Sequence, residues 1–315
     1  MDRHWGRTRP AIKTLIILNP FAASGRAGKL WGEIEPLLWE LLGELVVAVT
    51  QRPEEVAQHL ELAYAAGLTR VISIGGDGTN HALVNALAAL NERHPEGPQM
   101  VYGNLPVGTG RDWARNLGTP FDIKAAAHWI AQAQPHPTDV GLLTFDGKRE
   151  HFLNIGSAGM GGEVDRYING LSQRRPWSFL QATVSTLLRY QPPPIRIALD
   201  GQEWYEGTAY IVAVSNGSTF AHGMKIAPNA EINDGLFDVI LVKGMSRLRI
   251  LAALWSVYNG SHLSHPCVQA GRARQVQIDK SALNSTPLGL DLDGEHAEGH
   301  SLTFEMRPGL LQLLT

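Results

Sequence analysis

Residues 71–90 read VISIGGDGTNHALVNALAAL, and this stretch predicts both a fold class and a ligand. A short apolar run rich in β-branched residues covers 71–74, whereas apolar residues recur at helical spacing from Ala82 to Leu90. Residues 75–79 therefore form a turn that leads from a strand into a helix. Turns of this kind lie where open α/β sheets bind their ligands.

The composition of this turn is typical of a phosphate cradle. Gly75, Gly76 and Gly78 carry no Cβ, so the amides of the turn and of the first helical turn can converge on a phosphate. A phosphate repels Asp77 unless a cation such as Mg²⁺, or a hydroxyl group to be oriented, lies between them. The implied ligand is a metal–nucleotide. The alternative is a loop whose glycines only permit a tight turn.

Two further strand–helix units precede this one. Leu15–Leu18 predicts a buried strand, and the turn NPFAASGRAGK at 19–29 leads from it into a helix. This turn is not a Walker A loop, because Lys29 is followed by Leu30 where Ser or Thr would hold Mg²⁺. A second strand at 45–50 is followed by a helix that begins near Pro53 and ends at Gly67.

A fourth strand at 100–107 is followed by GTGRDWARNLG, which repeats the glycine turn with Asp112 at the start of a helix. Because parallel strands end at one edge of a sheet, Asp77 and Thr79 are expected near Thr109 and Asp112. Asp112 can alternatively complement the helix dipole. Neither glycine turn completes GxGxxG, which argues against a nicotinamide oxidoreductase.

The length of 315 residues suffices for two domains, and the pattern changes between Gln134 and Asp139. The predicted first domain is a doubly wound α/β domain with a mostly parallel sheet over residues 1–136. Residues 137–300 predict a mainly β, sandwich-like domain whose hairpins close at Asp-Gly turns, interrupted by helices within 178–190 and 246–260. The final segment, 301–315, is expected to return to the first domain.

The charge balance and the cysteine content indicate the class of partner and the cellular compartment. A formal net charge of −3 argues against a nucleic-acid surface. The single Cys267 excludes an internal disulfide and fits a reducing compartment. No apolar run approaches the roughly 18 residues of a membrane-spanning helix. A cytoplasmic location is expected.

Four motifs in this order carry a family resemblance: GGDGT, LPVGTGRDWAR, NDGLFDVILV and LDLDGE. Together they resemble the diacylglycerol kinase catalytic-domain family, which includes bacterial lipid kinases and more distantly the sphingosine kinases. The resemblance covers nearly the whole chain. It implies a kinase that uses ATP and Mg²⁺ to phosphorylate a lipid hydroxyl, with ATP between the two domains.

The resemblance also implies roles for individual residues. Asp77 and Asp112, with Asp139 as a further candidate, would form an acidic network linked to Mg²⁺. Glu295 in LDLDGE would be the general base, with Asp293 as second choice. The residues implied to contact the nucleotide are Asn19, Thr50, Gly75, Gly76, Asp77, Gly78, Thr79, Asn80, His81 and Thr109.

A second metal site is implied within IAPNAEINDGLFDVILV, where Asp234 and the main chains of Glu231 and Leu236 would bind a structural Mg²⁺. Without the family, this segment is equally an Asp-Gly hairpin turn.

Three residues depart from the family pattern: His81 and Ala82 stand where Asn and Glu are frequent, and Arg111 where Asn is usual before Asp112. His81 can also be a surface histidine on a helix. The departures leave a non-catalytic nucleotide- or lipid-binding homologue as an alternative. Because GGDG alone also resembles NAD kinase, a soluble-substrate kinase of that kind is a further alternative, which the second glycine loop disfavours.

The expected partner is a lipid substrate at a membrane surface. RRPWSFL at 174–180 combines arginines with Trp177 and Phe179, a mix that favours an interface with anionic headgroups, although a helix start with buried aromatics is the alternative. Further expectations are peripheral attachment to the inner face of the membrane and formation of a homodimer.

Overall fold

The computed structural model of the chain describes residues 13–108, 111–170, 178–221, 223–280 and 286–315. They form two compact units. The first comprises residues up to Gly108 together with Thr119–His136 and Gln312–Thr315, and the second comprises Thr109–Gly118 and Pro137–Leu311. The second unit thus takes in residues 111–118, which the predicted boundaries place in the first domain.

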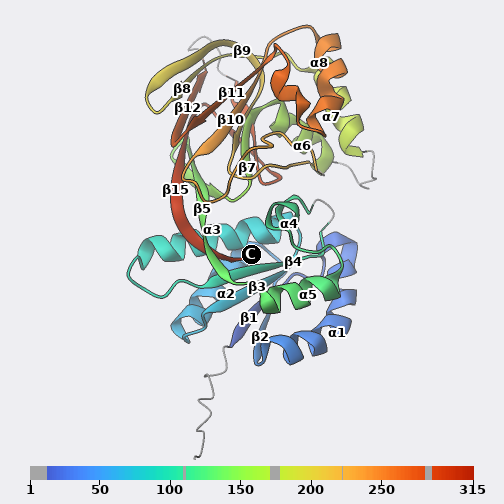
Figure 1. The fold of residues 1–315 in the computed structure, drawn as a ribbon, viewed down its shortest axis with the longest axis vertical. Coiled ribbons are helices and arrows are strands. Elements are labelled where there is room, and N and C mark those ends of the chain that lie inside the picture. Colours follow the sequence, from blue (N-terminus) through green and yellow to red (C-terminus); the bar gives the residue numbers. More distant parts are fainter. Residues whose placement is uncertain (1–12, 109–110, 171–177, 222, 281–285) are drawn as a thin grey trace, which may run out of the picture. The chain divides into compact units, whose positions relative to one another are not determined.

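The first unit is built on a parallel sheet with strand order β15-β4-β3-β1-β2 (Figure 1). Its strands are β1 (Thr14–Leu18), β2 (Leu45–Val49), β3 (Arg70–Gly75), β4 (Val101–Pro106) and the end of β15 (Ser301–Leu314). Its helices are α1 (Ala22–Leu42), α2 (Glu54–Ala65), α3 (Asp77–Arg93) and α5 (Ile123–Gln132).

Helices cover both faces of this sheet, which explains why its central strands are continuous apolar runs. α1 packs with α5 and α2 packs with α3, one pair on each face (Figure 1). All five residues of β1 are buried. Ile34 and Leu38 of α1 lie against Ile72 and Ile74 of β3 in one buried cluster. The predicted doubly wound α/β domain is confirmed.

The second unit is a β-sandwich with helices attached. Its strands are β5 (Pro135–Phe145), β6 (Lys148–Phe152), β7 (Ile155–Gly159), β8 (Pro194–Leu199), β9 (Gln202–Ser215), β10 (Phe237–Lys243), β11 (Val268–Ala273), β12 (Gln275–Lys280), β13 (Leu288–Leu292), β14 (Glu295–Gly299) and most of β15. Its helices are α4 (Asp112–Leu117), α6 (Met160–Asn169), α7 (Ser178–Arg189), α8 (Arg247–Ala253) and the 3₁₀ helices η1 (Leu254–Val257) and η2 (Ser261–Ser264).

The long strand β9 joins the two sheets of the sandwich. Its first half pairs with β8, followed by β12 and β15, while its second half pairs with β7 and β10. Aromatic rings fill the core between the sheets: the Phe152 centroid lies 5.8 Å from that of Phe237 and 5.9 Å from that of Phe304. The sandwich-like second domain is confirmed.

Asp-Gly turns close three hairpins as their sequence predicts. Asp146, Asp200 and Asp293 have φ values of 46°, 49° and 53°, and the glycine after each also has a positive φ. This is the backbone of a tight two-residue hairpin turn, which Asp and Gly tolerate best. Helix α6 was not predicted, although Met160, Val164 and Ile168 recur at helical spacing, because Gly161 and Gly162 in its first turn disfavour a helix. Within the described ranges, no helix is long and apolar enough to span a membrane.

Candidate active site

The turn between β3 and α3 is shaped by two glycines with different tasks. A Cβ on Gly75 would lie 2.5 Å from both Cβ and Oγ1 of Thr79, so only glycine fits there. A Cβ on Gly76 would meet nothing within 4 Å, so this residue faces open space. A Cβ on Gly108, after β4, would lie 3.3 Å from the Cα of Gly76. The two glycine turns are thus in close backbone contact within the first unit.

The loop after β1 contributes to the same edge of the sheet. The Asn19 side-chain amide donates to Oγ1 of Thr79 at 3.2 Å. Ala23, Ser24 and Gly25 follow in the left-handed region, with φ values of 52°, 59° and 83°. Left-handed non-glycine residues are strained and gather at functional sites. This strained turn lies next to the predicted phosphate cradle.

A pocket of about 180 Å³ opens between these loops. It lies entirely within the first unit. Thr50 is buried at the end of β2, and Arg52 adds a guanidinium that also pairs with Glu55 at 3.2 Å. A cation and convergent turn amides suit a phosphate group. The residues that line this glycine-turn pocket include Asn19, Thr50, Arg52, Gly76, Gly78 and Thr79.

Asp77 and Asn80 have different surroundings in the first turn of α3. Asp77 is exposed at the first helical residue, where the helix dipole favours a carboxylate. The Asn80 side-chain oxygen instead accepts hydrogen bonds from Ser73 at 2.8 Å, Tyr102 at 3.2 Å and Asn104 at 2.9 Å. Asn80 therefore fastens the start of α3 to β3 and β4.

His81 is a buried residue, only 8% exposed, so the surface-histidine alternative is wrong. Its Nε2 lies 3.2 Å from the side-chain amide of Asn85, one helical turn further along α3. The neighbouring Ala82 is half-buried.

In the second unit, Asn154 anchors two catalytic candidates. Its side-chain oxygen accepts from Asn116 of α4 at 2.6 Å, and α4 begins with Asp112. Its backbone N–H donates to the Asp293 carboxylate at 2.9 Å, in the turn that precedes Glu295. The helix that carries Asp112 and the hairpin that carries Glu295 thus share one anchor within this unit. Asp77 belongs to the first unit.

Asp112 pairs with Arg115 at 2.8 Å, one turn along α4. The preceding Arg111 has a φ of 57°, a left-handed conformation that Asn adopts more readily than Arg. The departure at Arg111 therefore falls on a position where the backbone favours the usual family residue. The predicted contact residue Thr109 lies outside the described residues.

The hairpin tip that carries Glu295 is firmly held. The Asp293 carboxylate accepts hydrogen bonds from the backbone N–H groups of Leu153, Asn154 and Ile155 at 2.6–2.9 Å. Asp293 thus serves as an anchor, whereas Glu295 is exposed at the first residue of β14. An exposed carboxylate on a rigid turn is well placed to accept a proton.

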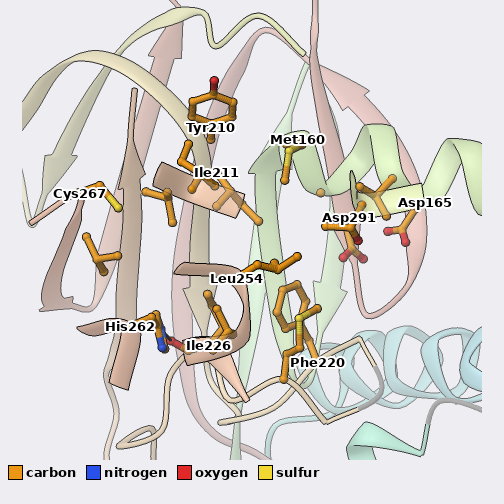
Figure 2. Close-up of a pocket in the computed structure, with 18 residues that line it drawn as sticks. Met160, Asp165, Tyr210, Ile211, Phe220, Ile226, Leu254, His262, Cys267 and Asp291 are labelled. Atoms are coloured by element: carbon orange, nitrogen blue, oxygen red, sulfur yellow. Dashed lines mark hydrogen bonds between the residues drawn. The ribbon is translucent and has the colours of Figure 1, made fainter. Parts of the chain in front are cut away.

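An apolar pocket lies beside this hairpin, within the second unit (Figure 2). Its volume is about 110 Å³, and its lining is almost entirely apolar. Its lining residues include Met160, Val164, Ile211, Phe220, Leu254 and Val257.

Two carboxyl groups form a polar end to this apolar pocket. Asp165 of α6 and Asp291 of β13 both line it and point toward one another (Figure 2). Burial and the neighbouring Asp165 carboxyl raise the pKa of Asp291 well above its usual range. Oδ1 of Asp291 also accepts from the backbone N–H of Gly294 at 2.8 Å, which links the pocket to the Glu295 turn. The pair therefore keeps a proton to a higher pH than exposed carboxyls do.

A buried histidine lines another part of the apolar pocket. Nε2 of His262 lies 2.9 Å from the Ile226 carbonyl oxygen, so this nitrogen carries the proton and donates it. Burial lowers the pKa of His262, which favours the neutral ring.

In the predicted structural metal loop, the Asp234 carboxylate contacts other groups of the protein. One Asp234 oxygen accepts from the Leu236 N–H at 3.0 Å, and the other forms an ion pair with Arg272. Arg272 also lies 3.4 Å from an Asp238 oxygen, so a guanidinium already balances these carboxylates. Glu231 is exposed beside them. Among the described residues, no group of three or more His, Cys, Asp or Glu side chains is arranged to hold a metal ion.

The Asp139 carboxylate is hydrogen-bonded to the backbone on both of its oxygens. One carboxylate oxygen accepts from the Gly235 N–H at 2.7 Å and the other from the Gly309 N–H at 2.7 Å. It is buried, and it fastens β5 to β15 and to the loop before β10. The two backbone donors account for its charge without a metal.

The fold and these two pockets agree with the chain's similarity to known families. Residues 154–315 match the YegS C-terminal NAD kinase beta sandwich-like domain, and residues 13–143 match the diacylglycerol kinase catalytic domain. The chain belongs to this family of lipid kinases. The family resemblance drawn from the four motifs is confirmed, and the protein is a kinase.

Relatives match over the length of this lipid kinase. A diacylglycerol kinase of Mycobacterium tuberculosis (strain CDC 1551 / Oshkosh) is 29% identical over 311 residues, 96% of this chain and 94% of the relative. One from Bacillus subtilis (strain 168) is 27% identical over 242 residues, 72% of this chain and 71% of the relative. A crystal structure of a diacylglycerol kinase from Bacillus anthracis str. Sterne has the same fold, with a TM-score of 0.71, 22% identity and 97% coverage of both chains.

Several residues of the candidate site carry no sequence signal. Asn116 and Asn154 are separated by 38 residues and meet only in the fold. Arg52 follows a strand but belongs to no glycine motif. Asp165 lies in a helix that was not predicted. Asp291 differs from the other carboxylates of LDLDGE in being buried, which the sequence does not reveal.

Proposed function

We propose that this kinase transfers the γ-phosphoryl group of ATP, with Mg²⁺, to the hydroxyl group of a diacylglycerol-like lipid. The observation that carries the proposal is the apolar lining of the pocket in the unit that also holds Asp112 and Glu295. An apolar lining favours contact with an acyl chain and offers little to a soluble, highly charged acceptor.

The nucleotide is assigned to the glycine-turn pocket. Its open backbone at Gly76, the Asn19–Thr79 contact and the Arg52 guanidinium fit phosphate groups. Mg²⁺ would supply positive charge between the phosphates and Asp77, whose exposed carboxylate suits a hard cation. The four motifs support Thr109 as a further nucleotide contact.

The acceptor's polar group is assigned to the carboxyl end of the apolar pocket. A carboxyl pair that shares a proton can both donate to and accept from a hydroxyl group. Glu295 takes up the acceptor proton as the new bond to phosphorus forms. The peripheral membrane contact and the homodimer stay predictions.

The test is transfer of labelled phosphate from ATP to a panel of acceptors that contains diacylglycerol, a sphingoid base and NAD. We expect a product only with lipid, and transfer to NAD alone would favour the soluble-substrate alternative. Asp77→Asn should abolish transfer and change the unfolding temperature little, because the exposed carboxylate acts on the Mg²⁺ and phosphate charges.

Asp122→Asn is the matched control, since Asp122 also stands at a helix start but caps α5 by accepting from the Ala125 N–H at 2.9 Å. Asn caps helices as well as Asp does, so this variant should keep full transfer. A wild-type protein that binds ATP and lipid but transfers nothing would support the non-catalytic alternative.

A further inference from the structure

The exposed large apolar side chains of the second unit gather on its helices. Among the described residues of this unit they are Tyr167 on α6, Leu188 on α7, Trp255 on η1 and Tyr258 directly after it. The strands of the sandwich contribute none within the same ranges. α6 contacts α7, α7 contacts α8, and α8 contacts η1, so the helices form one continuous group (Figure 1).

The 3₁₀ helix η1 has two functional sides. Side chains three residues apart lie above one another in a 3₁₀ helix. Leu254 and Val257 accordingly share a side that lines the apolar pocket, while Trp255 and Tyr258 share a side that faces out. Trp255 is 65% exposed and its ring centroid lies 6.0 Å from that of Tyr258. One thin wall therefore separates an exposed aromatic pair from the pocket.

The helices α7, α8 and η1 lie in stretches of sequence whose charged residues are all basic. Residues 166–199 and 239–278 contain no Asp or Glu, although the chain as a whole has a net charge of −3. Arg189 at the end of α7 and Arg247 and Arg249 on α8 are exposed. Arg166 adds little, because Glu163 and Glu298 pair with it. Helices that carry exposed arginines and no carboxylate of their own are complementary to anionic lipid headgroups.

We infer that the face formed by α7, α8 and η1 docks on an anionic membrane surface, with Trp255 and Tyr258 in the headgroup region. Aromatic rings with a polar edge favour that region, and basic side chains around them add electrostatic attraction. The wall formed by Leu254 and Val257 is then the passage by which a lipid leaves the bilayer for the apolar pocket. This docking face rests on the proposed function for the identity of the lipid.

The experiment compares the wild type with Trp255→Ala/Tyr258→Ala and, as matched control, Trp39→Ala. Trp39 is 46% exposed on α1 of the first unit, outside the docking face. Sedimentation with vesicles of phosphatidylcholine and phosphatidylglycerol is measured without ATP. Transfer is then measured to a long-chain diacylglycerol in those vesicles and to a short-chain diacylglycerol dispersed in water.

The double variant should bind vesicles about tenfold or more weakly, since each buried aromatic ring contributes about that factor or more. It should lose transfer to the vesicle substrate in parallel but keep transfer to the short-chain substrate, and Trp39→Ala should behave like the wild type. Arg189→Glu/Arg249→Glu should also weaken vesicle binding, and the remaining binding of this variant should depend less on salt.

Vesicle binding that is unchanged in the double variant overturns the inference. Equal loss of transfer to both substrates overturns it too, because the aromatic pair would then serve the pocket itself. A dimer that dissociates in the double variant while vesicle binding persists assigns the face to a second copy of the chain. A wild type that binds vesicles through these residues but phosphorylates no lipid refutes the proposed function and leaves the docking face in place.

Discussion

Two adjacent glycines of the phosphate turn should respond to alanine in opposite ways. In Gly75→Ala the new methyl carbon would lie 2.5 Å from Cβ and Oγ1 of Thr79 and 2.7 Å from its Cγ2. Thr79 cannot move aside easily: it is buried, its χ1 is restricted by branching at Cβ, and Asn19 donates to its hydroxyl group. The clash must therefore shift the backbone at the start of α3.

Overpacking of this kind costs about 1–3 kcal/mol of unfolding free energy. For a unit of this size, that loss lowers the unfolding temperature by roughly 3–10 °C. Gly76→Ala should leave the unfolding free energy within about 0.5 kcal/mol, because its Cβ meets nothing within 4 Å and its φ of −97° suits any residue. Its methyl group would instead stand beside the glycine-turn pocket and weaken ATP binding.

Differential scanning calorimetry measures the unfolding temperature, and ATP titration of the folded variants measures affinity. We expect a lower transition temperature only in Gly75→Ala. In Gly76→Ala we expect weaker ATP binding at an unchanged transition temperature. Wild-type stability of Gly75→Ala, or equal destabilisation of both variants, would refute the packing argument.

Two further predictions concern carboxyl groups of the second unit. Glu295→Gln keeps the shape of an exposed side chain but removes its basicity, so turnover should fall about 10²–10⁴-fold with ATP affinity and unfolding temperature unchanged; wild-type turnover would exclude Glu295 as the base. The raised pKa of Asp291, caused first by burial and then by Asp165, means that the native state holds this proton more tightly than the unfolded chain does. Stability should therefore fall as pH rises above the ordinary carboxyl range of about 4, by at most about 1.4 kcal/mol per pH unit for one proton. Asp291→Asn should lessen that fall when unfolding temperatures are compared between pH 5 and 8, and an unchanged slope would contradict the buried-pair assignment.

The sequence predicted the first unit well because its signals are local. A parallel sheet covered on both faces needs strands that are apolar throughout, and amphipathic helices must follow them. Glycine turns mark the functional edge of such a sheet directly, since a missing Cβ is a property of the residue itself. Asp-Gly pairs likewise specify tight hairpins wherever they occur, as at Asp146 and Asp200.

Some site residues have tasks that their motifs do not reveal. Asp293 and Asp139 look like catalytic or metal-linked carboxylates, yet backbone N–H groups occupy the oxygens of both. Asn80 follows GGDGT directly but is bonded into the sheet. A carboxylate that anchors a loop and one that faces a substrate have the same residue type, and only their neighbours distinguish them.

By itself the sequence determined the order of strands and helices in the first unit, the family and the glycine turns, because each depends on residues close together in the chain. The tertiary structure alone decided the anchor at Asn154, the buried pair of Asp165 and Asp291, and the apolar pocket beside η1. These features join residues that lie between 38 and 139 positions apart, or consist of space enclosed by several elements. Contacts over such separations have no period in the sequence, so they become visible only when the packed sandwich brings the residues together.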